Sequence, residues 1–146
     1  MKKGNKFFAK KITVNGETFD SKLEYERYNY LKSCQSKGMI TDLNRQSVFV
    51  LIGNQYEIVS KQLKTKVKSV KRVAERQCVY KADFTYKVNN RNVVEDTKSK
   101  YTRTKDYIIK RKLMLFIHKI KVYEVTKPTQ PIYIPTSIFC DDEEEE

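Results

Sequence analysis

The chain has 146 residues, enough for one domain with a hydrophobic core and too few for two domains of ordinary size. Leu, Ile, Val and Phe make up about 26% of the residues, above the roughly 20% below which chains tend to remain disordered. The formal net charge is +12, and outside the acidic run 141–146 the 30 basic residues face only 12 acidic ones. Such an excess attracts polyanions, so nucleic acid is the expected partner.

The composition argues against several other classes of protein. No apolar run approaches the roughly 18 residues of a membrane span, so we expect a cytoplasmic protein with no membrane partner. The three cysteines lie far apart and His118 is the only histidine, which disfavours a zinc site, a disulfide framework and a histidine-centred triad. The chemistry that remains is that of carboxylates, lysines and a hard metal ion.

The first third of the chain predicts a basic arm, a helix and a strand. Residues 1–18 are typical of a basic arm or short strand that ends at the turn Asn15-Gly16. From Ser21 onward, apolar and aromatic residues recur at helical spacing and predict a helix that ends at Gly38. The β-branched and aromatic residues of 46–52 predict a strand.

Residues 60–76 fit two patterns. Their apolar residues have helical spacing, whereas Lys64, Lys66 and Lys68 alternate as they would on an exposed ribbon. Either structure carries a basic surface, which is either a solvated face or a flap that contacts DNA. The sequence leaves both questions open.

Residues 78–88 and 92–98 predict the two strands of a hairpin, joined by the turn Asn89-Asn90-Arg91. Because side chains alternate along a strand, we expect Asp96 and Lys98 on one face and Glu95 on the other. The pairing also brings Asp83 toward Asp96. The opposite face of the first strand is expected to carry Tyr80, Ala82, Phe84 and Tyr86.

The last third predicts a helix, a strand and a tail. Residues 104–118 form an amphipathic pattern whose apolar side carries Ile109, Leu113, Phe116 and Ile117. Residues 120–126 alternate as a strand, which we expect to run parallel to 92–98 because a helix connects the two. The predicted fold class is therefore α/β, with a mixed central β-sheet flanked by helices. The proline-containing tail 128–146 ends in the acidic run, which is either a solubilising extension or a phosphate mimic.

Three carboxylates and one amine are the candidate functional groups: Glu24, Asp83, Asp96 and Lys98. Carboxylates at strand ends suit a hard divalent cation, which lowers the pKa of bound water and neutralises charge on a phosphodiester. A lysine beside them stabilises charge that develops in the transition state. This combination, in a very basic chain, indicates hydrolysis of a nucleic acid.

The same residues resemble the PD-(D/E)xK nuclease superfamily, in particular phage junction-resolving (Holliday junction resolvase-like) endonucleases and a group of small phage endonucleases. The likeness rests on F-D-S-K-L-E at 19–24, A-D-F at 82–84 and E-D-T-K at 95–98. Two departures stand out, because alanine replaces the proline before Asp83 and Glu95 competes with Asp96 as a ligand.

The resemblance implies a restriction-endonuclease-like core over residues 19–127 and a DNA endonuclease that acts on branched or junction DNA. It implies that Glu24, Asp83, Asp96 and Lys98 are catalytic, and that Asp83, Asp96 and Glu24 bind Mg²⁺, with Mn²⁺ as a substitute. Cutting both arms of a junction implies a symmetric homodimer. A phage-encoded protein of this kind would act in the host cytoplasm.

Each assignment has a structural alternative. Ser21 and Glu24 match a capping box, in which the glutamate serves only the helix N-terminus. Asp83 and Lys98 fit a cross-strand ion pair, and Asp96 fits a surface acid at a strand end. His118 is expected to be a surface or capping residue. The alternative function is that of a noncatalytic basic DNA- or RNA-binding protein.

Several basic residues are predicted to contact DNA phosphates next to the candidate site. Tyr101, which lies between Lys100 and Arg103 in the sequence, either stacks on a base or packs against the protein. The predicted contacts are Lys22, Lys100, Arg103, Lys105 and Arg111.

Overall fold

The computed structural model describes residues 10–135 of the chain. The acidic run 141–146, and with it the predicted phosphate mimic, lies outside the described residues. The chain enters through a small hairpin of β1 (Ile12–Val14) and β2 (Glu17–Phe19). The predicted turn is confirmed, since Asn15 and Gly16 both have positive φ, at 51° and 80°, which these two residues tolerate well.

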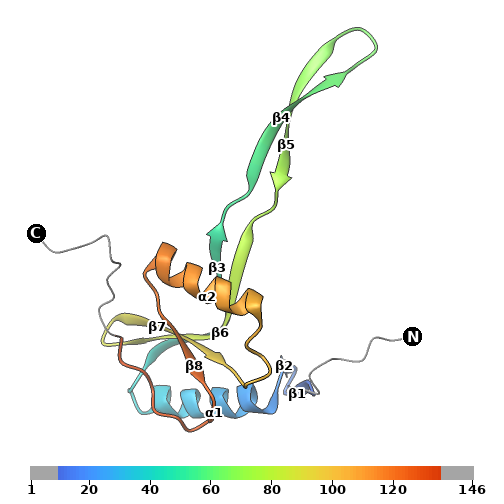
Figure 1. Ribbon diagram of the computed structural model, residues 1–146. Helices are drawn as coiled ribbons and strands as arrows, with labels where there is room; N and C mark the ends of the chain where they lie inside the picture. The colour runs from blue at the N-terminus through green and yellow to red at the C-terminus, as the bar shows by residue number, and fades with distance from the viewer. Residues whose placement is uncertain (1–9, 136–146) are drawn as a thin grey trace, which may run out of the picture.

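The centre of the fold is a four-stranded mixed sheet in the order β3-β6-β7-β8 (Figure 1). Its first three strands are antiparallel, and β8 runs parallel to β7 as predicted. The α/β class with a mixed sheet is therefore confirmed. The strands are β3 (Thr41–Ile52), β6 (Cys78–Val88), β7 (Arg91–Thr97) and β8 (Val122–Val125).

Two helices flank the sheet on opposite sides (Figure 1). The first, α1 (Lys22–Ser36), begins at the N-cap Ser21 and is followed by Gly38 at φ 74°, so the predicted helix is confirmed. The second, α2 (Lys105–His118), begins at the N-cap Thr104. Within the described part of the chain, neither helix combines the length and apolar character needed to cross a membrane.

The buried face of α2 differs from the predicted one. Tyr107 and Met114 are its buried residues, whereas Ile109 and Phe116 are 57% and 68% exposed. Ile117 is also exposed, and Leu113 packs only partly against the core. The pattern was misleading because α2 has apolar or aromatic residues around most of its circumference, so spacing alone could not select the face that packs on the sheet.

Two hydrophobic clusters lie on the two sides of the sheet. The α1 side contains Phe84 and Tyr86, and the α2 side contains Tyr80 and Ala82. The four even-numbered residues of β6 therefore do not share one face, contrary to the prediction. Since alternate residues of a regular strand keep to one face, the alternation must be interrupted between Ala82 and Phe84, at Asp83.

The neighbouring strand β3 changes faces at the same level. Leu43 packs on the α1 side and Phe49 on the α2 side, although both are odd-numbered. Gln46 lies between them, opposite Asp83, and has a positive φ of 53°, which is uncommon for a residue other than glycine. The sheet is thus locally irregular at Gln46 and Asp83.

Beyond this sheet the chain forms a separate two-stranded ribbon of β4 (Gln55–Gln62) and β5 (Val67–Glu75). The ribbon continues from the ends of β3 and β6 and projects away from the body of the protein (Figure 1). The sequence did not decide between a helix and a ribbon for residues 60–76. In the structure they belong mainly to the ribbon and include no helix.

Candidate functional site

The hairpin of β6 and β7 brings Asp83 and Asp96 together, as its pattern predicted. Its turn is Asn89-Asn90, both with positive φ, and Arg91 already pairs with Val88. The backbone N–H of Asp83 donates a hydrogen bond of 2.9 Å to Oδ1 of Asp96. The irregularity at Asp83 thus turns its backbone amide toward a side chain.

Asp96 is a buried carboxylate with three partners in the protein. It is 2% exposed, so it is not a surface acid. Besides accepting the bond from Asp83, it accepts one from the hydroxyl of Tyr80, and Nζ of Lys98 lies 3.4 Å from its Oδ2. Burial, and then the charge of Asp83, raise the pKa of Asp96 to about 6, and Lys98 opposes the increase.

The carboxylate of Asp83 is bound by Thr97, the last residue of β7. Its Oδ2 accepts hydrogen bonds from the backbone N–H and the hydroxyl of Thr97, at 2.9 and 2.7 Å. Its Oδ1 lies 3.5 Å from Nε2 of Gln46. Among the ion pairs of the described residues, that of Lys98 is with Asp96, so the alternative of an Asp83–Lys98 ion pair is wrong.

Glu24 combines a capping role with a contact toward this site. Ser21 caps α1 by accepting a bond of 3.1 Å from the Glu24 backbone N–H, and Oε2 of Glu24 accepts one of 2.8 Å from that of Asp20. The other oxygen, Oε1, accepts 3.0 Å from Nε2 of Gln46. Burial, and then the charge of Asp83, raise the pKa of Glu24. One oxygen of Glu24 thus serves the start of α1, while the other contacts Gln46 and lies 3.7 Å from the guanidinium of Arg45.

The four predicted site residues are consequently linked by one chain of contacts. It runs from Glu24 through Gln46 to Asp83, and from there through Asp96 to Lys98. Within residues 10–135, no group of three or more His, Cys, Asp and Glu side chains is arranged to hold a metal ion. Their carboxylate oxygens nevertheless fit a hard divalent cation in type, because burial and the charge of Asp83 raise the pKa values of Glu24 and Asp96 even with Arg45 and Lys98 beside them.

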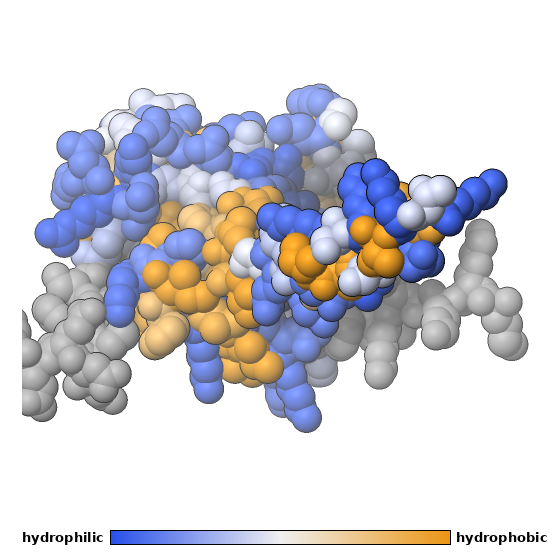
Figure 2. Space-filling view, turned by 90° about the horizontal axis from the view of Figure 1, so that it is seen from above, coloured by the Kyte–Doolittle hydropathy of each residue, from blue (hydrophilic) through white to orange (hydrophobic). Residues whose placement is uncertain are grey.

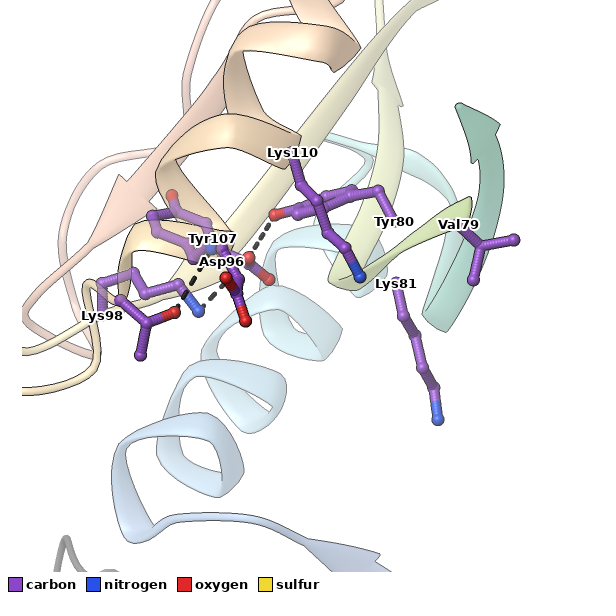
Figure 3. Close-up of a pocket in the computed structure, with 9 residues that line it drawn as sticks. Val79, Tyr80, Lys81, Asp96, Lys98, Tyr107 and Lys110 are labelled. Atoms are coloured by element: carbon purple, nitrogen blue, oxygen red, sulfur yellow. Dashed lines mark hydrogen bonds and ion pairs between the residues drawn. The ribbon is translucent and has the colours of Figure 1, made fainter. Parts of the chain in front are cut away.

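A pocket of about 340 Å³ opens on the α2 side of this chain of contacts. Figure 3 shows the ammonium of Lys98 and the hydroxyl of Tyr80 turned toward Asp96 within it. Lys81 and Lys110 also line the pocket, but Glu24 and Asp83 do not. The structure thus places Asp96 and Lys98 in the pocket, and Glu24 and Asp83 beside it.

Glu95, the competing ligand, is excluded by its surroundings. It is fully buried on the α1 side, where Arg27 contacts it twice, at 2.9 and 2.6 Å. The hydroxyl of Tyr86 donates to it as well. The strand alternation that favoured Asp96 over Glu95 is confirmed at this end of the sheet.

The residues predicted to contact DNA differ in their surroundings. Arg103 and Arg111 both bind Glu124, at 2.6 and 2.8 Å. Lys22 pairs with Glu26 at 3.6 Å, while Lys100 and Lys105 are exposed. Their contacts with DNA remain predictions. Of the two alternatives for Tyr101, packing is wrong, since its side chain is 72% exposed. His118 is exposed, as expected, and its Nε2 lies 2.8 Å from the carbonyl oxygen of Val50.

Sequence reasoning did not identify three residues of this site. Gln46 gave no signal, since nothing in its neighbours indicates a positive φ within a predicted strand. Lys81 lines the pocket together with its neighbour Tyr80, although strand alternation places adjacent residues on opposite faces, so spacing alone would not have selected it. Lys110 was treated as part of the polar side of its helix, although Tyr107, one turn earlier, lines the same pocket.

The family model described as "Protein of unknown function (DUF1064)" matches residues 4–129, so the chain belongs to this family. No curated protein matches the chain. No solved structure matches it either.

Proposed function

We propose that this protein is a metal-dependent DNA endonuclease of the PD-(D/E)xK type, with a restriction-endonuclease-like core. One observation carries the proposal: Asp83 and Asp96 come from neighbouring strands and are joined by a direct hydrogen bond. Lys98, two residues beyond Asp96, contacts its carboxylate, and Glu24 reaches Asp83 through Gln46. The four residues on which the resemblance rests are thus neighbours in space.

The electrostatics of these carboxylates support a cation-assisted reaction. The raised pKa values of Glu24 and Asp96 have burial as their main cause and the charge of Asp83 as the second. Mg²⁺, or Mn²⁺ in its place, held by Asp83, Asp96 and Glu24, would neutralise phosphate charge and supply an activated water. Tyr80 and the Asp83 backbone keep the Asp96 carboxylate in a fixed orientation.

The lysines of the pocket fit a phosphodiester substrate. Lys98 holds its ammonium beside Asp96 and over the ring of Tyr107, at 4.2 Å from the ring centroid. In the proposed reaction it stabilises the charge that develops on the scissile phosphate. Lys81 and Lys110 bind the flanking phosphates from the same pocket. Branched or junction DNA is the proposed substrate, and a symmetric homodimer provides the two sites that paired cuts require.

Incubation with four-way junction, nicked and linear duplex DNA in magnesium tests the proposal. We expect Asp83→Asn and Lys98→Ala to lower the cutting rate more than about 100-fold, because loss of outer contacts alone costs 10–100-fold at metal sites. Asp106→Asn removes an acid from the pocket lining outside the chain of contacts and serves as the matched control. Full cutting by both variants, with DNA binding retained, would contradict the assigned site.

A noncatalytic nucleic-acid-binding protein is the second candidate. It is favoured by the hydrogen bonds that Asp83 and Asp96 already accept from Thr97, Tyr80 and the backbone, as structural carboxylates do. A wild-type protein that binds these DNAs in a salt-dependent way and cuts none of them would favour this candidate.

A further inference from the structure

The ribbon of β4 and β5 is the element that the proposed site does not use. Its strands pair with each other and do not join the four-stranded sheet. A two-stranded ribbon in water is marginally stable by itself, and this one projects well beyond the core (Figure 1). The features of its surface should therefore indicate what it contacts.

The outer part of the ribbon is strongly basic. Residues 58–74 include six basic side chains and no acidic one. Two of the six have partners near the base, since Arg72 pairs with Glu57 at 2.5 Å and Lys71 lies over the ring of Tyr56. Within residues 10–135, no ion pair is formed by the other four, which are Lys61, Lys64, Lys66 and Lys68.

The strand register creates an electrostatic repulsion within the ribbon that an anionic partner would relieve. Lys61 lies directly opposite Lys68, and like charges in such a pair destabilise a ribbon. Lys64 and Lys66 follow in the loop at the tip. Four ammonium groups that form no ion pair with any described residue are thus concentrated at the end of the ribbon, where phosphates would offset their repulsion.

We infer that the ribbon is an arm that binds the sugar–phosphate backbone of duplex DNA beyond the cleavage site, an inference that rests on the proposed DNA substrate. The eight residues of β4 span about 26 Å at roughly 3.3 Å per residue. Phosphates on one DNA strand recur about every 3.4 Å, so the arm covers several of them. A major groove about 12 Å wide admits a two-stranded ribbon.

The connection of the arm to the site supports the same partner. β3 and β6, which carry Gln46 and Asp83, continue into β4 and β5 after two residues each. DNA bound at the carboxylates therefore has the base of the arm about 17 Å away, because Asp83 lies five residues from Cys78, where β6 begins, at roughly 3.3 Å per residue. The arm binds phosphates and reads no base sequence, so it increases affinity for any duplex flank.

The opposite face of the ribbon carries its large exposed apolar side chains, together with Lys71, and provides a control. Tyr56, Ile58, Val67 and Val73 are exposed there, and Figure 2 shows hydrophobic side chains on the ribbon as well as a broad hydrophobic area beside it. If the apolar face bound DNA or a second subunit, the double variant Ile58→Ser/Val67→Ser would weaken DNA binding or change the oligomeric state on which binding depends. If the lysines bind the DNA, we expect this double variant to have unchanged DNA affinity.

The test is DNA binding to a linear duplex over a series of salt concentrations in EDTA, so that cleavage plays no part. We expect Lys64→Gln/Lys66→Gln/Lys68→Gln to reduce the slope of log K against log salt by about 2 to 3, at about 0.9 per phosphate contact. The matched control is Lys10→Gln/Lys37→Gln/Lys127→Gln, which removes the same charge from exposed lysines outside the ribbon.

Equal salt slopes for the two triple variants, or weaker DNA binding by the apolar-face variant alone, would contradict the inference that the lysines of the ribbon bind DNA. Cutting in magnesium, measured separately, decides the proposed function. If the wild-type protein binds DNA through the ribbon but never cuts it, the DNA-binding role of the ribbon is supported and the nuclease proposal is wrong. If the wild-type protein cuts DNA and the ribbon variant has an unchanged salt slope, the nuclease proposal is supported and the role of the ribbon is wrong.

Discussion

The backbone amide of Asp83 donates a hydrogen bond to Oδ1 of Asp96, and this bond exists because the strand alternation is interrupted at Asp83. In a regular antiparallel pair that amide would serve the backbone ladder. Here it fixes one carboxylate beside the other, and their repulsion adds to the burial that raises the pKa of Asp96. The irregularity in the sheet and the electrostatics of the site therefore have a common origin.

The pH dependence of stability should report this arrangement. Because the pKa of Asp96 is raised to about 6, the folded state binds this proton more tightly than the unfolded state, and the stability cost of the ionised form is fully present above pH 6. In EDTA, we expect Asp96→Asn to be more stable than wild type at pH 7.5, with a difference that declines as the pH falls through 6 toward 4. Urea unfolding at several pH values measures it. A stability difference that does not change with pH would show that ionisation of Asp96 does not destabilise the folded protein.

A divalent cation should stabilise the folded protein if the carboxylates hold it. At a concentration about 100 times the dissociation constant, binding adds about 2.7 kcal/mol to the free energy of unfolding, which corresponds to a rise in Tm of several degrees. We expect Mn²⁺ or Mg²⁺ to produce this rise in wild type and in Asp106→Asn, and a much smaller one in Asp83→Asn and Glu24→Gln. Thermal unfolding with and without EDTA provides the readout. The same rise in all four proteins would place the cation elsewhere.

The sequence predicted the position of Asp96 in this site correctly but missed the irregular backbone at Asp83. Strand alternation correctly separated Asp96 from Glu95, and the turn residues Asn89 and Asn90 fixed the pairing with the neighbouring strand. The same rule failed at Asp83, because alternation assumes a regular strand and the irregularity depends on tertiary contacts. No local pattern indicates that Gln46 takes a positive φ opposite Asp83.

Helix α2 shows a second limit of the sequence. Its existence and bounds were predictable from the cap at Thr104 and the apolar spacing, but its orientation was not. Tyr107 and Met114 are buried because they meet the α2 side of the sheet, while Phe116 remains exposed. A helix with apolar residues on most sides has no unique buried face until the sheet selects one.

The buried pair of Arg27 and Glu95 should matter for stability and not for the cation. Removing one partner from a buried ion pair leaves an uncompensated charge and costs about 3–5 kcal/mol. We expect Glu95→Ala to lose this much in urea unfolding, and Arg27→Met/Glu95→Leu to recover a large part of it. The cation-induced rise in Tm should persist in the double variant. Its loss there, with folding intact, would return Glu95 to the list of candidate ligands.

Gln46 provides the sharpest test of the space between Glu24 and Asp83. Its Nε2 lies 3.0 Å from Oε1 of Glu24 and 3.5 Å from Oδ1 of Asp83, so one neutral amide bridges two carboxylates. Gln46→Glu places a third negative charge there. In EDTA at pH 7.5 we expect a lower Tm than that of Gln46→Ala, because like charges repel, and with Mn²⁺ a larger rise in Tm than wild type shows. Gln46→Ala, which removes the bridge without adding charge, is the control. If Gln46→Glu gains no more from the cation than Gln46→Ala does, the cation does not bind between Glu24 and Asp83.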